Sequence, residues 1–412
     1  MKYYVLYLLC LAAIIAYVQR LAFSVCEQHI RVDLELDKAQ IGQIMAAWQL
    51  GYALMQLPSG WLADRIGSRR SLAIFIVAWS GMLGVAAWCT NYTSLITAWC
   101  LMGMAQAGVF PCSTKLIGEQ FGETFRATAS GFLASSMALG IALAPLLTTQ
   151  LLEAGHSWQT IFGWYVIPGW LWASVFFFST PNKASMAPQH EPATGMPVVS
   201  PKIRWMDFLT SVPMWLLCGQ QFFRAAAMMF FQSWFPTFLR ETRGVDLAAS
   251  GKLAFVVGIG ALLGGMSGGI FSDWLLRRTG NRRLARQGIA LTGMLSCGCL
   301  IGLSYFISNT NLAIACVSLG AFLATFGGVS GYTMAIEFGG KHVAKTFSIM
   351  NMCGNIGAAL FPLLAGYISE GPTGWTGVLF LSVIILVVDA ICWALLNPTH
   401  TISGESLKYE KS

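Results

Sequence analysis

Two arginines lie inside long apolar runs of the 412-residue chain. Arg224 is 16 residues from Phe208 and 15 from Leu239, so in a helix rising about 1.5 Å per residue it lies roughly 24 Å from either end. A charge at that depth in a bilayer costs at least ~2.5 kcal/mol, so the side chain must face a wet cavity or a partner. A guanidinium grips a carboxylate bidentately, and carboxylate binding is therefore the predicted chemistry. The structural alternative is an arginine satisfied by backbone carbonyls.

Arg20 lies late in the first apolar run, about five residues before the predicted end of that run at Val25. From there the side chain could snorkel to the membrane surface, which is the structural alternative at this position. If both arginines face one central space, they line an aqueous path with positive charge, and such a path suits a carboxylate. The sequence therefore predicts that Arg20 and Arg224 bind a small organic anion.

Polar side chains recur at helical spacing beside these arginines. Gln220 lies four residues before Arg224, which puts both residues on one helix face. Single polar residues in membrane helices also serve as contacts between helices, and this alternative stays open for each of them. The residues that we predict to orient the anion or to form the walls of its cavity are Tyr17, Tyr52, Gln56, Gln220, Ser330, Tyr332, Asn351 and Asn355.

The composition is that of a membrane protein. Of the 412 residues, 56% are hydrophobic and only 10% are charged, whereas a soluble protein has about 25% charged residues. This excludes a secreted enzyme, a nucleic-acid-binding module and a disordered scaffold, and it makes the lipid bilayer a partner of the chain. The 11 cysteines form no Cys-x-x-Cys pair, and the sequence has no Cys/His cluster, phosphate-binding loop or nucleophile–base pair. We therefore expect no metal, no cofactor and no enzymatic activity.

The apolar runs are long enough to cross a bilayer, which takes roughly 20 residues per helix. The first run is too long for a signal peptide, and no cleavage site of the Ala-x-Ala kind follows it. We predict an all-α membrane protein with twelve transmembrane helices at Tyr3–Val25, Ile41–Ala63, Ser71–Cys89, Ser94–Ile117, Ser130–Leu152, Trp158–Phe178, Val212–Leu239, Leu253–Leu276, Leu284–Ile307, Leu312–Ile336, Phe347–Ile368 and Trp375–Leu396.

Lysine and arginine are distributed unevenly between the two sides that these helices define. The loops on the side away from the N-terminus hold few of them, and the other loops and both tails hold the remainder. Because cytoplasmic loops are enriched in Lys and Arg, we predict that both termini are cytoplasmic. The longest connection then divides the chain into an N-terminal six-helix bundle (1–180), a cytoplasmic linker (181–207), a C-terminal six-helix bundle (208–400) and a cytoplasmic tail (401–412).

A repeated motif agrees with this division. Residues 60–70 read Gly-Trp-Leu-Ala-Asp-Arg-Ile-Gly-Ser-Arg-Arg, and residues 269–283 repeat the glycines, the aspartate and the paired arginines with four extra residues. A carboxylate at Asp64 can cap the positive end of a neighbouring helix, and Gly67 allows a tight turn. The residues that we predict to latch the cytoplasmic side are Asp64, Arg65, Gly67, Arg69 and Asp273.

The stretch 60–70 resembles the cytoplasmic signature of the major facilitator superfamily, and the longer run 41–64 is similar to the anion:cation symporter family within it. That family includes bacterial galactonate and glucarate transporters and the sialic-acid and vesicular glutamate carriers of animals. Further resemblances are Arg20, 104–111, 234–237, Gly354–Asn355, Gly357 and Pro362. The resemblance covers all twelve predicted helices. It implies two pseudo-symmetric halves that alternate access to a central anion site, and it favours import.

The chain departs from this family at positions that imply proton coupling. Gln19 precedes Arg20 where the family has an acidic residue, and Trp99 and Gln106 align with its arginine and glutamate of helix four; Gln106 stays a candidate substrate contact. A neutral amide does not titrate near pH 7. Asp389 is the only carboxylate that we place well inside an apolar run, and we expect it to be either protonated or paired. The helix that carries it should face away from the substrate. We expect facilitated transport or transport driven by sodium or the membrane potential, while the coupling cation, sodium or a proton, stays open.

The sequence thus predicts a monomeric transporter of a small organic anion, such as a sugar acid or a mono- or dicarboxylate, in the inner membrane of a bacterial cell. A proton-driven drug or metabolite exporter is one alternative. It would need an acidic residue in the cavity and a Gly-Pro motif in helix five, which residues 140–145 match poorly. A membrane sensor that binds the same anion without transporting it is the other alternative, and the short tails with no appended domain count against it.

Overall fold

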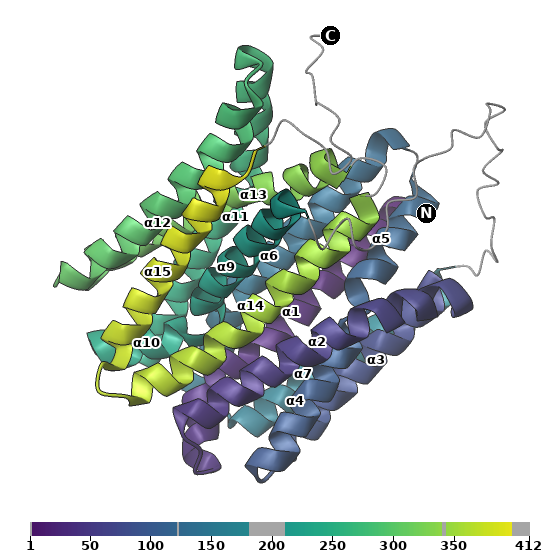
Figure 1. Cartoon of the computed structure of the whole chain (residues 1–412). Coiled ribbons are helices and arrows are strands. Elements are labelled where there is room, and N and C mark those ends of the chain that lie inside the picture. The colour runs from purple at the N-terminus through teal and green to yellow at the C-terminus, as the bar shows by residue number, and fades with distance from the viewer. Residues whose placement is uncertain (1, 122, 181–210, 340–342, 398–412) are drawn as a thin grey trace.

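The computed structural model describes residues 2–121, 123–180, 211–339 and 343–397. Within these residues every regular element is helical, and the helices run alongside one another in one bundle (Figure 1). The elements are α1 (Lys2–Asp33), α2 (Lys38–Ile66), α3 (Ser68–Ala87), α4 (Tyr92–Gln106), α5 (Val109–Gln120), α6 (Glu123–Glu153), α7 (Trp158–Ser179), α9 (Val212–Met229), η1 (Phe230–Trp234), α10 (Phe235–Arg243), α11 (Leu247–Thr279), η2 (Arg283–Gly288), α12 (Ile289–Phe306), α13 (Thr310–Gly339), α14 (Val343–Glu370) and α15 (Gly374–Leu395); η marks a π-helix.

Ten helical stretches in the described part of the chain are long and apolar enough to cross a membrane, which confirms a multi-pass membrane protein. The second and seventh predicted spans, α2 and the continuous run α9–η1–α10, are outside this set. Both carry several of the polar residues that line the central cavity, among them Gln49, Gln56, Gln221 and Arg224, and these residues lower their hydropathy. Their lengths are consistent with twelve spans, and that number stays a prediction.

The helices pack as two groups, the N-terminal group α1–α7 and the C-terminal group α9–α15. Within the first, α1 packs on α6, α2 on α4 and α3 on α7; within the second, α13 packs on α11 and α12, and α9 on α14. The groups meet where α2 packs on α14 and α6 on α11. We call the end at which α1 begins and α15 ends the basic end, and the opposite end, with the α1–α2 and α14–α15 connections, the distal end (Figure 1).

Close approaches between the two groups lie toward the distal end. A side chain at Gly42 would meet the backbone of Pro362, and one at Gly251 would meet the side chain of Thr149. Since glycine alone permits such approaches, the sequence fixes tight packing of α2 on α14 and of α11 on α6 in this half of the bundle.

Several helix boundaries differ from the sequence prediction by a few residues, and α6 begins seven residues early, at Glu123 rather than Ser130. The first helix continues to Asp33, eight residues beyond the predicted end at Val25. The fourth predicted span is divided into α4 and α5 at Gly108, where a Cβ atom would overlap the ring of Phe75. The tight turn predicted at Gly67 is confirmed, because this residue joins α2 to α3 with φ of 89°, a backbone conformation that favours glycine. The predicted linker (181–207) and tail (401–412) lie outside the described residues.

Candidate substrate-binding cavity

A cavity of about 630 Å³ lies between the two helix groups. Its size is in the range of small-molecule binding sites, roughly 300–1,000 Å³. It extends from Pro236 near the distal end to Thr114 and Phe347 toward the basic end. Eight of the predicted binding residues line it, and they are Tyr17, Arg20, Tyr52, Gln56, Arg224, Tyr332, Asn351 and Asn355.

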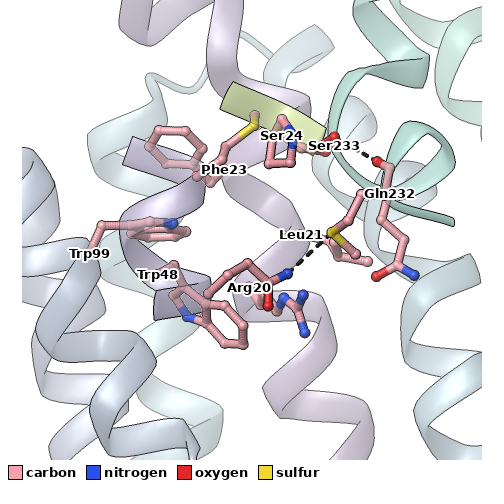
Figure 2. Close-up of a pocket in the computed structure, with 12 residues that line it drawn as sticks. Arg20, Leu21, Phe23, Ser24, Trp48, Trp99, Gln232 and Ser233 are labelled. Carbon is pink, nitrogen blue, oxygen red and sulfur yellow. Dashed lines mark hydrogen bonds between the residues drawn. The ribbon is translucent and has the colours of Figure 1, made fainter. Parts of the chain in front are cut away.

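Arg20 enters the cavity from α1 with aromatic rings around its guanidinium group. The guanidinium carbon lies 3.8 Å from the ring centroid of Trp48 and 5.6 Å from that of Tyr17. A cation over an aromatic face is stabilised by the quadrupole of the ring, and Figure 2 shows Arg20 beside Trp48. Arg20 forms no ion pair with a carboxylate of the described residues. Its charge is therefore held in place by neutral groups and stays available to an anion.

Arg224 enters the cavity from α9, in the opposite group. Its Nη2 donates to Gln221 Oε1 at 2.8 Å and to the Tyr332 hydroxyl at 3.2 Å. The guanidinium carbon also lies 5.3 Å from the ring centroid of Tyr332. As with Arg20, no ion pair to a carboxylate is found in the described part of the chain. The two helix groups thus each contribute one arginine that has only neutral hydrogen-bond or aromatic partners.

Amide side chains connect the groups across the cavity. Gln56 Oε1 of α2 accepts hydrogen bonds from Asn351 Nδ2 at 3.2 Å and from Asn355 Nδ2 at 3.3 Å, both on α14. Gln49 Nε2 lies 3.1 Å from Met229 Sδ, again between α2 and the C-terminal group. These amides can exchange their mutual hydrogen bonds for hydrogen bonds to a polar ligand, and they span the boundary that must separate if the groups move apart.

The cavity adjoins a small pocket of about 40 Å³ on the distal side of Arg20. Figure 2 shows Trp48 and Trp99 on one side of this pocket and Gln232 on the other. Gln232 belongs to η1, and π-helical turns of this kind often occur at functional sites. Gln232 was not predicted from the sequence, because a π-helical turn shifts the residues that follow it to another face of the helix. A hydrophobic pattern of period 3.6 does not show where such a turn occurs.

Three predicted binding residues lie outside the lining of the cavity. Gln106 donates to the carbonyl oxygen of Ala16 at 3.1 Å inside the N-terminal group. Gln220 donates to its own helix at Leu217, and Ser330 is buried inside the C-terminal group. These three side chains serve helix packing in this conformation, which is the alternative that was open for each of them.

Beyond the small pocket, charged residues of both groups form what we call the distal ion cluster, made of Glu27, Arg31, Lys38, Arg240 and Glu241. Glu27 of α1 is fully buried, and its carboxylate lies 3.5 Å from Arg31 and 3.5 Å from Arg240 of α10. It also accepts a hydrogen bond from the hydroxyl of Thr237. The prediction that Asp389 is the only carboxylate well inside a helix is therefore wrong, because α1 continues past Val25 and carries Glu27 inward.

Glu241 of α10 completes the distal ion cluster. Its carboxylate lies 3.1 Å from Arg31 and 2.7 Å from Lys38, both of the N-terminal group. Trp375 of α15 donates its indole N–H to the same carboxylate at 2.7 Å. Each carboxylate of the cluster thus faces at least one cation of the opposite group, and the cluster joins the two groups at the distal end.

The predicted latch residues lie at the basic end. Asp273 Oδ1 pairs with Arg286 Nη1 at 2.8 Å, which ties α11 to η2. Arg69 donates from Nε to Thr180 Oγ1 at 2.8 Å and so ties α3 to the end of α7. Arg65 is exposed, with its guanidinium carbon 5.2 Å from the ring centroid of Trp61. The side chain of Asp64 lies outside the described residues, and its capping role stays a prediction.

The chain matches the sequence profile of the Major Facilitator Superfamily over residues 8–336 and 285–408. The chain belongs to this superfamily. A probable sulfoacetate transporter of Cupriavidus necator is 24% identical over 99% of the chain and 96% of that protein. A D-galactonate transporter of Escherichia coli is 26% identical over 96% of the chain and 95% of that protein.

A solved structure of the same fold is that of a bacterial homologue of the human lysosomal transporter Spinster. It has a TM-score of 0.77 and 19% sequence identity, and the alignment covers 96% of each chain. The expected superfamily fold is thereby confirmed. These relatives are membrane transporters rather than enzymes, and within the described residues no group of three or more His, Cys, Asp and Glu side chains could hold a metal ion.

Proposed function

We propose that this protein transports a small organic anion with at least one carboxylate across the membrane by alternating access. The observation that carries the proposal is the pair Arg20 and Arg224, which reach one cavity from opposite helix groups without a carboxylate partner among the described residues. Two uncompensated cations in a cavity favour an anion, and the guanidinium group suits the planar carboxylate.

The relatives support this substrate class. Two of them are named for sulfoacetate and D-galactonate, and both compounds are small organic acids that are ionised near pH 7. The amides Gln56, Asn351 and Asn355 supply donors and acceptors of the kind that hydroxyl groups require. A sugar acid therefore fits the charge and the polarity of the cavity lining.

Alternating access follows from the arrangement of the two groups. In this conformation the groups touch at the distal end, and the cavity extends toward the basic end. An anion that compensates Arg20 and Arg224 at once draws the two groups together around it, because it has a partner in each group. Closure at the basic end and rupture of the distal ion cluster then expose the same site to the other side.

We further propose that the basic end faces the cytoplasm of a bacterial cell, that the protein acts as a monomer and that net transport is import. The excess of Lys and Arg at the basic end supports the orientation. On this orientation the cavity extends from the distal contacts between the groups toward the cytoplasm. A coupling cation would drive accumulation.

A counterflow experiment tests the proposal. Purified protein is reconstituted in vesicles loaded with unlabelled D-galactonate or sulfoacetate, and uptake of the labelled anion is compared with uptake of neutral D-galactose. We expect exchange of an anion and no exchange of galactose. Arg224→Ala should abolish exchange, whereas Arg278→Ala, which removes an arginine stacked on Trp274 outside the cavity, should retain it. Exchange of the neutral sugar at the same rate would contradict the proposal.

A further inference from the structure

The two helix groups touch along two seams, and the lining of the central cavity differs between these seams. At one seam α2 packs on α14, and at the other α6 packs on α11. The α2–α14 seam presents amide and hydroxyl groups to the cavity, and the residues that carry them are Gln49, Tyr52, Gln56, Asn351 and Asn355. We call these residues the amide wall. They can form hydrogen bonds to the polar groups of a ligand.

The α6–α11 seam presents no polar side chain to the cavity among the residues that the structure describes. We use the name apolar wall for the largest side chains that it contributes, which are Leu133, Met137, Ile141, Pro145, Val257 and Leu262. The other described lining residues of these two helices are alanine and glycine. The cavity thus has polar lining at one seam and apolar lining at the other.

Serines of α6 and α11 do not change the character of the apolar wall. Ser136 of α6 donates to its own backbone at 2.8 Å, and Ser267 of α11 does the same at 2.7 Å. The two helices also approach closely, because a Cβ atom at Gly258 would lie 2.9 Å from the Cα atom of Ala142. The two halves of the apolar wall are therefore joined, and a polar group placed against its side chains finds no hydrogen-bond partner in them.

Such a wall favours a ligand that has an apolar face. Covering apolar surface that would otherwise contact water is favourable, whereas a hydroxyl group placed against that surface loses water and gains no hydrogen bond. A sugar acid has hydroxyl groups along its whole carbon chain, so it can form hydrogen bonds with the amide wall but not with the apolar wall. The apolar wall therefore favours an acid with fewer hydroxyl groups and a larger apolar part.

Aromatic and thioether side chains favour a ring as that apolar part. Tyr332, which accepts a hydrogen bond from Arg224, has its ring centroid 5.7 Å from that of Phe347. Phe231 and Met228 also line the cavity. Aromatic rings pack favourably on one another in offset or edge-to-face geometry, and methionine sulfur makes favourable contacts with ring edges. A ring attached to a carboxylate thus has suitable partners close to Arg224.

Building on the proposed anion transport, we propose that the substrate is an aromatic carboxylate with a polar group on its ring. The carboxylate binds Arg20 and Arg224, the ring covers the apolar wall, and the polar group forms hydrogen bonds with the amide wall. D-Galactonate then binds through the arginines and the amide wall alone, and its affinity is lower because its hydroxyl groups face the apolar wall.

Three probes separate the contribution of the charge from that of the ring. The probe 4-hydroxybenzoate has both, 4-hydroxybenzamide keeps the ring and the hydroxyl group without the charge, and D-galactonate keeps the charge without the ring. In calorimetric titration of the wild-type protein in detergent, we expect 4-hydroxybenzoate to bind about tenfold or more tighter than D-galactonate and 4-hydroxybenzamide not to bind. The heat-capacity change of binding should be more negative for 4-hydroxybenzoate than for D-galactonate, because more apolar surface is buried.

Vesicles test whether the aromatic acid is transported as well as bound. Purified protein is reconstituted in vesicles loaded with unlabelled 4-hydroxybenzoate, and uptake of the labelled acid is corrected for uptake by vesicles without protein. We expect counterflow of 4-hydroxybenzoate by the wild type. Binding without counterflow would make this acid an inhibitor and would overturn the inference.

Variants of the apolar wall test where the ring lies. Met137→Gln introduces an amide at nearly constant side-chain length, and we expect a loss of about fivefold or more in affinity for 4-hydroxybenzoate and no loss for D-galactonate. Leu262→Gln makes the same test from α11. Met266→Gln is the matched control, since Met266 is exposed on α11 outside the cavity lining, and both affinities should stay at the wild-type values. Met137→Leu keeps the wall apolar and should keep the preference for the aromatic acid.

Several results would overturn the inference. They are D-galactonate binding as tightly as 4-hydroxybenzoate, 4-hydroxybenzamide binding as tightly as the acid, and an unchanged preference in both Met137→Gln and Leu262→Gln. If these variants do not fold, the affinities of the wild type decide alone. Wild-type protein that exchanges D-galactonate but not 4-hydroxybenzoate would overturn the inference and leave the proposed transport function in place. Wild-type protein that exchanges no organic anion would instead refute the proposed transport function.

Discussion

The central cavity and the distal ion cluster each hold arginines from both helix groups, yet the partners of these arginines differ. In the cluster, Arg31 and Arg240 face the carboxylates of Glu27 and Glu241 within 3.5 Å. In the cavity, Arg20 and Arg224 have amide, hydroxyl and aromatic partners only, as far as the described residues extend. An arginine whose charge is already neutralised holds the protein together. An arginine whose charge is oriented but not neutralised is available to bind an external anion.

Replacing one arginine of each kind with alanine should separate their roles most clearly. Arg224→Ala should weaken binding of D-galactonate or sulfoacetate at least tenfold, about 1.4 kcal/mol, because it removes the cation and its bidentate geometry. Arg224→Lys should lose part of the affinity, since lysine keeps the charge without the planar fork. Calorimetric titration in detergent measures both.

Arg240→Ala is the matched variant from the distal ion cluster. It should lower the melting temperature, because Glu27 is left buried with one cation fewer, and its effect on anion affinity should be much smaller than that of Arg224→Ala. Equal losses of affinity in the two variants would show that total positive charge, rather than the cavity arginines, determines binding.

Glu27→Gln should have the next largest effect. The amide keeps the shape of the side chain but removes the charge that joins Arg31 and Arg240, and we expect the closed distal end to be destabilised by about 1 kcal/mol. A cysteine introduced at Ser24, in the small pocket beside Arg20, should then react faster with a membrane-impermeant thiol reagent added from the distal side. An unchanged labelling rate, against the same cysteine in the wild-type background, would show that the cluster does not hold this end closed.

Gln56→Ala tests how much a neutral side chain of the cavity contributes to anion binding, relative to Arg224. It removes the acceptor that Asn351 and Asn355 share across the two groups, and each of these neutral hydrogen bonds contributes roughly 0.5–1 kcal/mol. We expect a change of about twofold to fivefold in anion affinity, well below that of Arg224→Ala. A loss of affinity as large as that of Arg224→Ala would show that the amides contribute as much to anion binding as the arginines.

Asp64→Asn should have the smallest effect. A charge near a helix end contributes ~0.3–1 kcal/mol, so transport should slow modestly while expression and membrane insertion stay normal. The rate of counterflow, normalised to the amount of protein in the vesicles, measures this. A rate equal to that of the wild type would limit the role of Asp64 to membrane topology.

The sequence predicted the helices and the cavity better than the contacts between helices. Arg20, Arg224, Tyr52 and Asn355 could be placed in the cavity because a polar residue deep in an apolar run has few other places to go. Helical spacing alone does not say which neighbour a polar face meets. Gln220 shares a face with Arg224 in sequence, yet it turns toward Leu217 in its own helix.

The distal ion cluster could not be predicted for a different reason. Its ion pairs join α1 and α2 to α10, more than 200 residues apart in the chain, and a single sequence carries no signal for such a pairing. The true end of α1 was also hidden, because the apolar run stops at Val25 while the helix continues through polar residues to Asp33. Buried ion pairs replace apolar contacts there, so hydropathy underestimates the buried length.

We propose that the cavity arginines select an anion by its charge. Calorimetric titration of the wild-type protein with D-galactonate, sulfoacetate and neutral D-galactose tests it most directly, because galactonate and galactose share most of their hydroxyl groups and differ in the carboxylate. We predict binding of at least one of the two anions and none of galactose at the same concentrations. Binding of galactose as tight as that of either anion would contradict the account.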